Sequence, residues 1–224
     1  MVLPPTSTGA FIETPRIAAA GEHRIDATAS TVGAMFSAGV GSTTLAYSRG
    51  MGDGRELTIS PIFQVYNDAN GDVRDFKASY RYGYGADVRL KLRPFESEHV
   101  ATFVGLGGVV NHYATFLAPS IGASLAYEND YVVPFVNAQA YLATPVASRD
   151  VIVLEDQTSG AIGPAPVRTV LHPSNTVGAL VSLGVQLKIA KVFSLKAAGT
   201  WGHVASETDD IGVGGIALGA GATF

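Results

Sequence analysis

A histidine, a serine and three carboxylates lie close together near the C-terminus and could together support hydrolysis. They are His203, Ser206, Glu207, Asp209 and Asp210. A nucleophilic serine needs a histidine to take its proton, and a carboxylate orients that histidine. Serine-rich acidic loops are common without such a triad, and the spacing alone does not bring the three groups together. We therefore expect no enzymatic activity, and we keep catalysis as an alternative.

Other motifs that could bind a cofactor or a metal fail on a required residue. The glycines at 39–41 and 105–108 lack the lysine that ends a phosphate-binding loop. The segment DANGDVRD at 68–75 resembles a calcium loop, but Ser79 stands where the closing glutamate is needed. The five histidines show no ligand spacing and cysteine is absent. We expect no cofactor and no metal.

Charged side chains occupy alternate positions in FKASYRYGYGADVRLKLR, residues 76–93. Successive side chains of a strand point to opposite faces, so one face of this segment is apolar and the other is charged. The alternation is much longer than the usual soluble strand of about five or six residues. A strand that crosses a bilayer needs about 9 to 11 residues. The charged face holds Lys77, Arg81, Asp87, Arg89 and Lys91.

The same alternation recurs in residues 56–67, 115–128, 176–190 and 192–203. It is weaker in 131–143, in 99–111, and in the first two expected strands near 22–31 and 40–51. With the final segment 211–224, the chain predicts an all-β, antiparallel up-and-down transmembrane barrel of ten strands, with eight as the alternative. The predicted lumen residues are Lys77, Arg81, Asp87, Arg89, Lys91, Gln186, Lys188 and Lys196, with Arg24, Asp26 and Glu56 as further candidates.

The composition favours a membrane barrel over the competing interpretation, a soluble β-sandwich or adhesin-like module. Hydrophobic residues make up 47% and charged residues 15% of the chain, against roughly 25% charged residues in soluble proteins. No apolar stretch is long enough for a membrane-spanning helix. The net charge of -4 lacks the basic footprint of nucleic-acid binding, so we expect no nucleic-acid partner.

The expected connections differ in length. Short turns at 52–55, 94–98, 129–130 and around Lys191 alternate with longer segments at 68–75, 147–175 and 205–210, with 111–115 as a short exception. Short turns of outer-membrane barrels face the periplasm, and an even strand count places both termini there. We assign 1–21 to a flexible N-terminal tail, 22–224 to one barrel domain, and 147–175 to a long outer loop that could bind an unknown ligand or protein.

The chain closes on IGVGGIALGAGATF, with Ile216 and Leu218 at alternate positions before the final Phe224. Over roughly residues 22–224 it resembles the small bacterial outer-membrane β-barrel proteins. The resemblance implies a place in the bacterial outer membrane, contact with its lipid, and recognition of these three residues by the barrel-assembly machinery. The excess of acidic residues in the longer loops predicts contact with lipopolysaccharide through divalent cations.

The charged lumen has two interpretations. It is either a salt-bridge network that fills a narrow barrel or an anion-attracting pore. Side chains just fill barrels of eight strands, and ten strands add little width, which favours the filled interior. We therefore predict a non-enzymatic outer-membrane protein that acts in envelope integrity or surface recognition through its loops. The alternatives are a small channel with weak anion preference and a lipid-modifying hydrolase.

Overall fold

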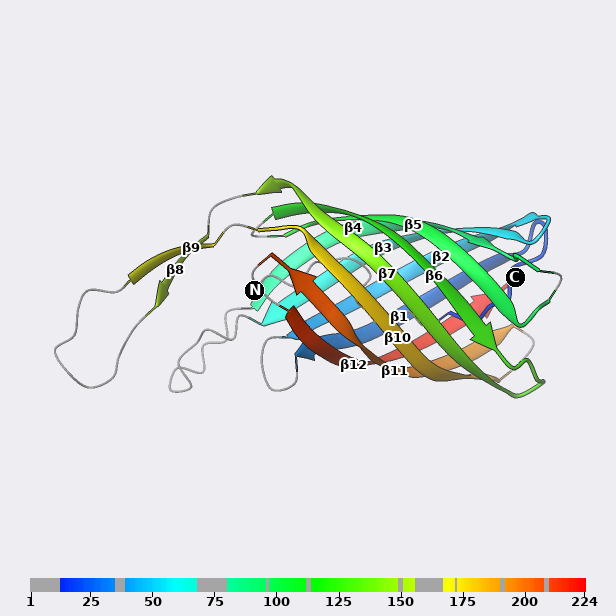
Figure 1. Cartoon of the computed structure of the whole chain (residues 1–224). Coiled ribbons are helices and arrows are strands. Elements are labelled where there is room, and N and C mark those ends of the chain that lie inside the picture. The colour runs from blue at the N-terminus through cyan, green and yellow to red at the C-terminus, as the bar shows by residue number, and fades with distance from the viewer. Residues whose placement is uncertain are drawn as a thin grey trace.

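The computed structural model shows a closed barrel and a separate two-stranded ribbon (Figure 1). It describes residues 13–34, 39–67, 80–95, 97–111, 114–148, 151–155, 167–171, 173–189, 192–207 and 210–224. Lys77, the side chain of Arg81 and the segment 68–75 lie outside the described part of the chain. Within that part, no helix is long and apolar enough to cross a membrane.

The barrel strands follow one another in chain order, and each pairs antiparallel with its neighbours. They are β1 (His23–Ala34), β2 (Gly39–Gly52), β3 (Arg55–Asn67), β4 (Tyr80–Leu92), β5 (Val100–Val110), β6 (Ala114–Ala126), β7 (Val132–Ser148), β10 (Thr176–Lys188), β11 (Phe193–Ser206) and β12 (Asp210–Thr223). β12 pairs with β1 and closes the sheet. The predicted barrel of ten strands is confirmed, and the eight-stranded and soluble sandwich alternatives are wrong.

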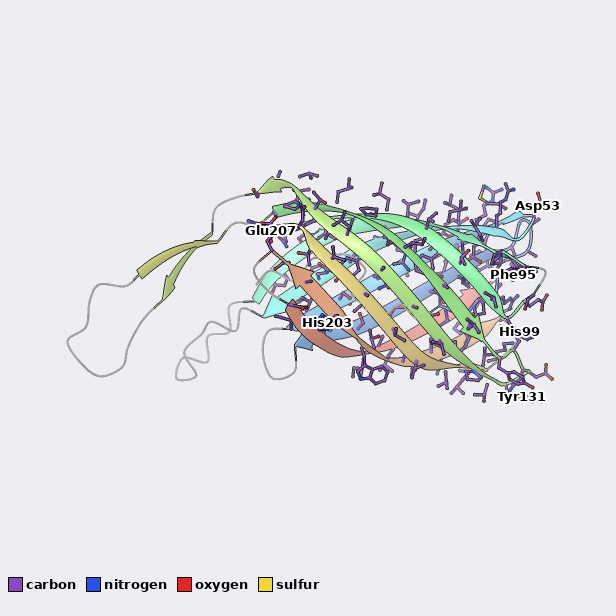
Figure 2. All side chains as sticks on the ribbon, in the orientation of Figure 1. Asp53, Phe95, His99, Tyr131, His203 and Glu207 are labelled. Atoms are coloured by element: carbon purple, nitrogen blue, oxygen red, sulfur yellow. The ribbon has the colours of Figure 1, made fainter. Side chains whose placement is uncertain are left out.

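The closed sheet separates two faces, as the alternation in the sequence predicts. In β7, residues from Val132 to Ala143 alternate strictly between exposed and buried. In β4, Tyr82, Tyr84 and Val88 are exposed on the outside, whereas Asp87, Arg89 and Lys91 are buried inside. The outer face is rich in large apolar side chains, which project from the barrel in Figure 2. A closed sheet with no edge and an apolar exterior meets the requirements of a strand-built membrane span.

The barrel has two distinct ends. Asp53, Phe95, His99 and Tyr131 lie at the end that carries the C-terminus, which we call the Phe224 end (Figures 1 and 2). The turn between β2 and β3 there is tight, with positive φ angles of 50° at Asp53, 83° at Gly52 and 67° at Gly54.

His203 and Glu207 lie at the opposite end (Figure 2). The sequence predicts a longer loop there at 205–210, but β11 continues to Ser206 and β12 begins at Asp210. Within the predicted loop 147–175, β8 (Val151–Glu155) and β9 (Val167–Leu171) pair as an antiparallel ribbon between β7 and β10.

Residues 13–22 precede β1 and pack against the inner wall at the Phe224 end; we call them the N-terminal segment. Thr14, Ile17 and Ala18 are buried. The sequence predicts a flexible tail over 1–21, and residues 13–21 differ from that expectation because side chains of the lumen bind their main chain. Residues 1–12 lie outside the described part of the chain.

Candidate functional site in the lumen

Seven charged side chains meet inside the barrel near the Phe224 end, where early positions of β1, β3 and β11 lie beside late positions of β4. Each stands at an inward position of its strand. Arg24 is 11% exposed at its side chain, and the others are buried more deeply still. We call this group the lumen charge cluster, and its members are Arg24, Asp26, Glu56, Asp87, Arg89, Lys91 and Lys196.

Arg24 is the centre of one half of the cluster. Its guanidinium donates to Asp26 Oδ2 at 2.7 Å and to Glu56 Oε1 at 2.8 Å. Lys196 Nζ donates to the other oxygen of Asp26 at 2.6 Å. Two cations therefore share Asp26, and removal of one partner from such a buried pair is costly because it leaves a charge without compensation.

The second half of the cluster comes from β4. Arg89 Nε forms an ion pair with Asp87 Oδ2 at 2.5 Å. The Arg89 guanidinium also lies over the Phe103 ring, 5.6 Å from its centroid. Lys91 Nζ is 3.9 Å from Glu56 Oε1. The wall thus contributes four cations (Arg24, Arg89, Lys91 and Lys196) and three carboxylates (Asp26, Glu56 and Asp87).

The N-terminal segment completes the cluster. Lys91 Nζ donates to the carbonyl oxygens of Thr14 at 2.7 Å and Arg16 at 3.2 Å, and it lies 3.3 Å from Glu13 Oε2. Glu56 Oε2 accepts the backbone N–H of Ala18 at 2.7 Å. The wall therefore binds this segment through carbonyl, amide and carboxylate groups together.

Toward the opposite end, buried apolar side chains line the described part of the lumen. Phe116, Tyr141 and Leu180 belong to one buried cluster with smaller aliphatic residues from six barrel strands. Between the two clusters, hydroxyl pairs bridge neighbouring strands, for example Ser30 with Ser42 at 2.8 Å. The members of the apolar lumen cluster are Val32, Val40, Ala114, Phe116, Ala118, Tyr141, Ala143, Leu180, Val204 and Val213.

Of the lumen residues predicted from sequence, Asp87, Arg89, Lys91 and Lys196 are brought together in the charge cluster. Gln186 is half-buried on β10. Lys188 is not part of the cluster, because it lies at the rim and donates to Glu128 at 2.8 Å and to the Asn129 carbonyl at 2.9 Å. Lys77 and the side chain of Arg81 are not described.

Sequence reasoning did not identify Glu13 as a lumen residue. Its partners on β4 follow it by more than seventy residues, as the separation of 77 between Thr14 and Lys91 illustrates. One signal was available, because Glu13 is the only carboxylate in residues 1–21. A single acidic residue beside a lumen with an excess of cations is an ion-pair candidate.

The three residues predicted as an assembly signal lie on the outer surface. Ile216, Leu218 and Phe224 are 65%, 62% and 66% exposed. His23 and Phe224 exchange two backbone hydrogen bonds of 2.9 Å at the closing seam, and their rings stack with centroids 6.0 Å apart. The His23 ring also accepts or donates a hydrogen bond of 2.6 Å with the Tyr47 hydroxyl.

Of the residues considered for catalysis, His203 and Asp210 are in contact in the structure. His203 Nδ1 lies 2.6 Å from Asp210 Oδ1 at the end opposite Phe224. The two side chains are 63% and 68% exposed, so the contact is set in water rather than in a closed pocket. Among the described residues, no group of three or more His, Cys, Asp or Glu side chains could hold a metal ion.

Of the comparisons with known proteins, only the one with solved structures found proteins that are similar to this chain. No protein-family model matches the chain, and no curated protein matches it. The N-terminal β-barrel domain of Pseudomonas aeruginosa OprF is 12% identical, with a TM-score of 0.41, and the match covers 92% of this chain and 98% of that domain.

Two further structures overlap similarly. The outer membrane protease OmpT from Escherichia coli is 9% identical, with a TM-score of 0.43 and coverage of 91% of this chain and 96% of OmpT. Ail, the attachment invasion locus protein of Yersinia pestis, is 15% identical, with a TM-score of 0.34 and coverage of 92% and 99%. The chain is thus similar to bacterial β-barrels, and its own fold rests on its strand order and register.

Proposed function

We propose that the protein is an integral, non-enzymatic barrel of the bacterial outer membrane, closed to ion flow, that acts in envelope integrity or surface recognition. The proposal is supported by the buried side chains that occupy both ends of the lumen. The charge cluster and the N-terminal segment occupy the Phe224 end, and the apolar lumen cluster occupies the other end. A barrel whose lumen holds these side chains has no open pore, so we expect it to act through its surface loops.

The proposed orientation places the Phe224 end, which carries the C-terminus and the start of β1, in the periplasm. The tight turn at Asp53 lies at that end, and the β8–β9 ribbon belongs to a connection at the other. Short turns are typical of the periplasmic side and longer loops of the outer side. The proposed partners are outer-membrane lipid, lipopolysaccharide, the barrel-assembly machinery at Ile216, Leu218 and Phe224, and an unknown ligand or protein at 147–175.

Two alternatives each have one supporting observation. The excess of cations in the wall supports a small channel with weak anion preference. The His203–Asp210 contact supports a hydrolase, because a carboxylate bound to Nδ1 orients an imidazole for proton transfer.

Conductance of the intact protein in a planar bilayer separates the leading proposal from the channel. We expect no discrete current steps, and reproducible anion-selective steps would favour the channel instead. Release of fatty acid from phospholipid vesicles, compared between the intact protein and His203→Ala, tests the hydrolase.

The orientation is tested in whole cells with an impermeant thiol reagent. The reagent should label Glu207→Cys and leave Phe95→Cys unlabelled. Both side chains are exposed, and the chain has no cysteine.

A further inference from the structure

Lys91 is a buried cation whose closest acceptors all come from the N-terminal segment. Its side chain is 2% exposed, and its ammonium group contacts the Thr14 carbonyl, the Arg16 carbonyl and the Glu13 carboxylate. In the described part of the wall, the carboxylate within ion-pair distance is Glu56, at 3.9 Å. Glu56 is itself engaged by Arg24 and by the backbone of the segment. Without the segment, Lys91 would lose its three nearest acceptors and would retain Glu56, at 3.9 Å, as its described ion-pair partner.

The charges of the wall and the segment are complementary. Within the lumen charge cluster, as far as the structure describes it, the wall supplies four cations and three carboxylates, and Glu13 adds a fourth carboxylate (Arg24, Arg89, Lys91 and Lys196 against Asp26, Glu56, Asp87 and Glu13). Glu13 lies 3.3 Å from Lys91 and 4.0 Å from Arg89. The two β4 cations therefore form a carboxylate site, and the segment supplies its occupant.

The wall also recognises main-chain groups of the segment. Glu56 accepts the Ala18 amide, while the Gly50 N–H donates to the Glu22 carbonyl at 3.0 Å. A Cβ atom at Gly50 would overlap the carbonyl oxygens of Ala18 and Ala19, so this glycine permits the close approach of the two backbones. The wall therefore contacts the carbonyl and amide groups of the segment as well as its Glu13 carboxylate. A site with contacts of both kinds is selective for a peptide that carries an acidic side chain over a free anion.

We propose that the lumen at the Phe224 end is a peptide-binding site for an extended acidic segment, occupied in the intact protein by residues 13–22. The segment continues directly into β1, and residues 13–22 belong to none of the paired strands, so its release breaks no strand pair of the barrel. Once it is released, the site accepts an acidic segment of another chain. This rests on the proposed function in one respect, since a closed barrel requires an occupied lumen, and the two are tested by different measurements.

Two full-length variants displace the segment by different means. Gly50→Leu places a side chain where the Ala18 and Ala19 carbonyls lie, and Glu13→Lys places a cation against Lys91 and Arg89. Gly41→Leu is the matched control, because among the described residues a Cβ on this glycine of the same strand meets the Val65 carbonyl oxygen alone, at 3.9 Å. Heat-modifiable migration in a gel verifies that each barrel is folded.

The readout is reaction of Lys91 with a water-soluble amine-reactive ester, measured by mass spectrometry in detergent. Lys188, at 28% side-chain exposure, is the internal reference. We expect Lys91 to be protected in the intact protein and in Gly41→Leu, and to react in both displaced variants. Adding the synthetic peptide ETPRIAAAGE, which has the sequence of residues 13–22, should restore protection. The same peptide with glutamine in place of Glu13 should bind roughly tenfold more weakly, as expected for loss of a charge-assisted contact.

Continued protection of Lys91 in both folded variants would overturn the proposal, because the segment would then not be displaceable. Reactive Lys91 that the peptide does not protect would also overturn it. Either result leaves the closed barrel standing if the intact protein does not conduct. Current through the intact protein would instead contradict the proposed function, without bearing on peptide binding to the displaced variants.

Discussion

At the scale of single residues, burial decides how much an ion pair contributes. Lys196 and Asp26 are 4% and 9% exposed and lie 2.6 Å apart. Arg16 and Glu22 lie at a similar 2.8 Å but are 48% and 20% exposed. Water screens the second pair, whereas a broken buried pair leaves a charge without compensation.

The change Lys196→Met should therefore reduce the free energy of unfolding by about 3 kcal/mol, the low end for a broken buried pair because Arg24 still binds Asp26. Arg16→Gln should cost about 0–1 kcal/mol. Denaturant titration in detergent, followed by the gel migration of folded barrel, measures both. Equal losses in the two variants would mean that the lumen is as well hydrated as the surface.

Aromatic rings in the lumen lie against glycines of the neighbouring strand. A Cβ at Gly178 would overlap the Tyr141 ring, whereas a Cβ at Gly212 would meet no heavy atom within 4 Å. We expect Gly178→Ala to destabilise the barrel by about 1–3 kcal/mol through overpacking, and Gly212→Ala to change stability much less. The same denaturant titration compares them. A neutral Gly178→Ala would show that the ring moves without cost.

At the scale of elements, the strands were predictable and the N-terminal segment was not. Period-two alternation in β4 and β10 follows from local sequence, because side chains in a strand point to opposite faces in turn. The N-terminal segment has no such pattern, and its small residues and prolines are typical of a flexible linker. Its structure depends on contacts of Thr14 with Lys91 and of Ala18 with Glu56, which span 77 and 38 residues of the sequence.

The charge cluster divides in the same way. Asp87, Arg89 and Lys91 could be placed inside from the alternation of a single segment. The contact of Lys196 with Asp26 spans 170 residues and depends on the closing register of β1, β12 and β11. Periodicity predicts which face a residue occupies, but strand register decides which other residue it meets.

The N-terminal segment should respond to acid. Burial raises the pKa of the Glu13 carboxyl, but Lys91, Arg89, Arg24 and Lys196 outweigh it and hold this pKa below its ordinary value. A depressed carboxyl pKa stabilises the bound segment at neutral pH, and that contribution is lost as the pH falls through the lowered pKa. Hydrogen-exchange protection of the Ala18 amide should fall accordingly at low pH. In the variant Glu13→Gln, protection of the Ala18 amide should fall less at low pH, because the Glu13 carboxyl no longer titrates. If protection depends on pH equally in the variant and in the unchanged protein, the Glu13 carboxyl does not hold the segment.

At the scale of the whole molecule, the exposed apolar side chains of the outer face indicate which solvent surrounds the barrel. Leu183, Val181 and Val177 lie at outward positions of β10 and are 50%, 45% and 56% exposed. No second layer in the described part of the chain covers them. The arrangement was predictable from the sequence because an apolar face without a packing partner requires a lipid solvent.

The depth dependence of a charged substitution tests this conclusion for the barrel as a whole. Leu183 lies near the middle of β10, and Leu187 lies next to the last residue of that strand at the Phe224 end; they are 50% and 45% exposed. An arginine at the bilayer midplane costs about 2–4 kcal/mol, and near the interface about 0–1 kcal/mol. Leu183→Arg should therefore destabilise the barrel more than Leu187→Arg when folding into phospholipid vesicles is measured by denaturant titration. The difference should shrink in detergent micelles, which adapt to the charge. Equal and small costs at both depths in vesicles would show that water, rather than lipid, covers this face.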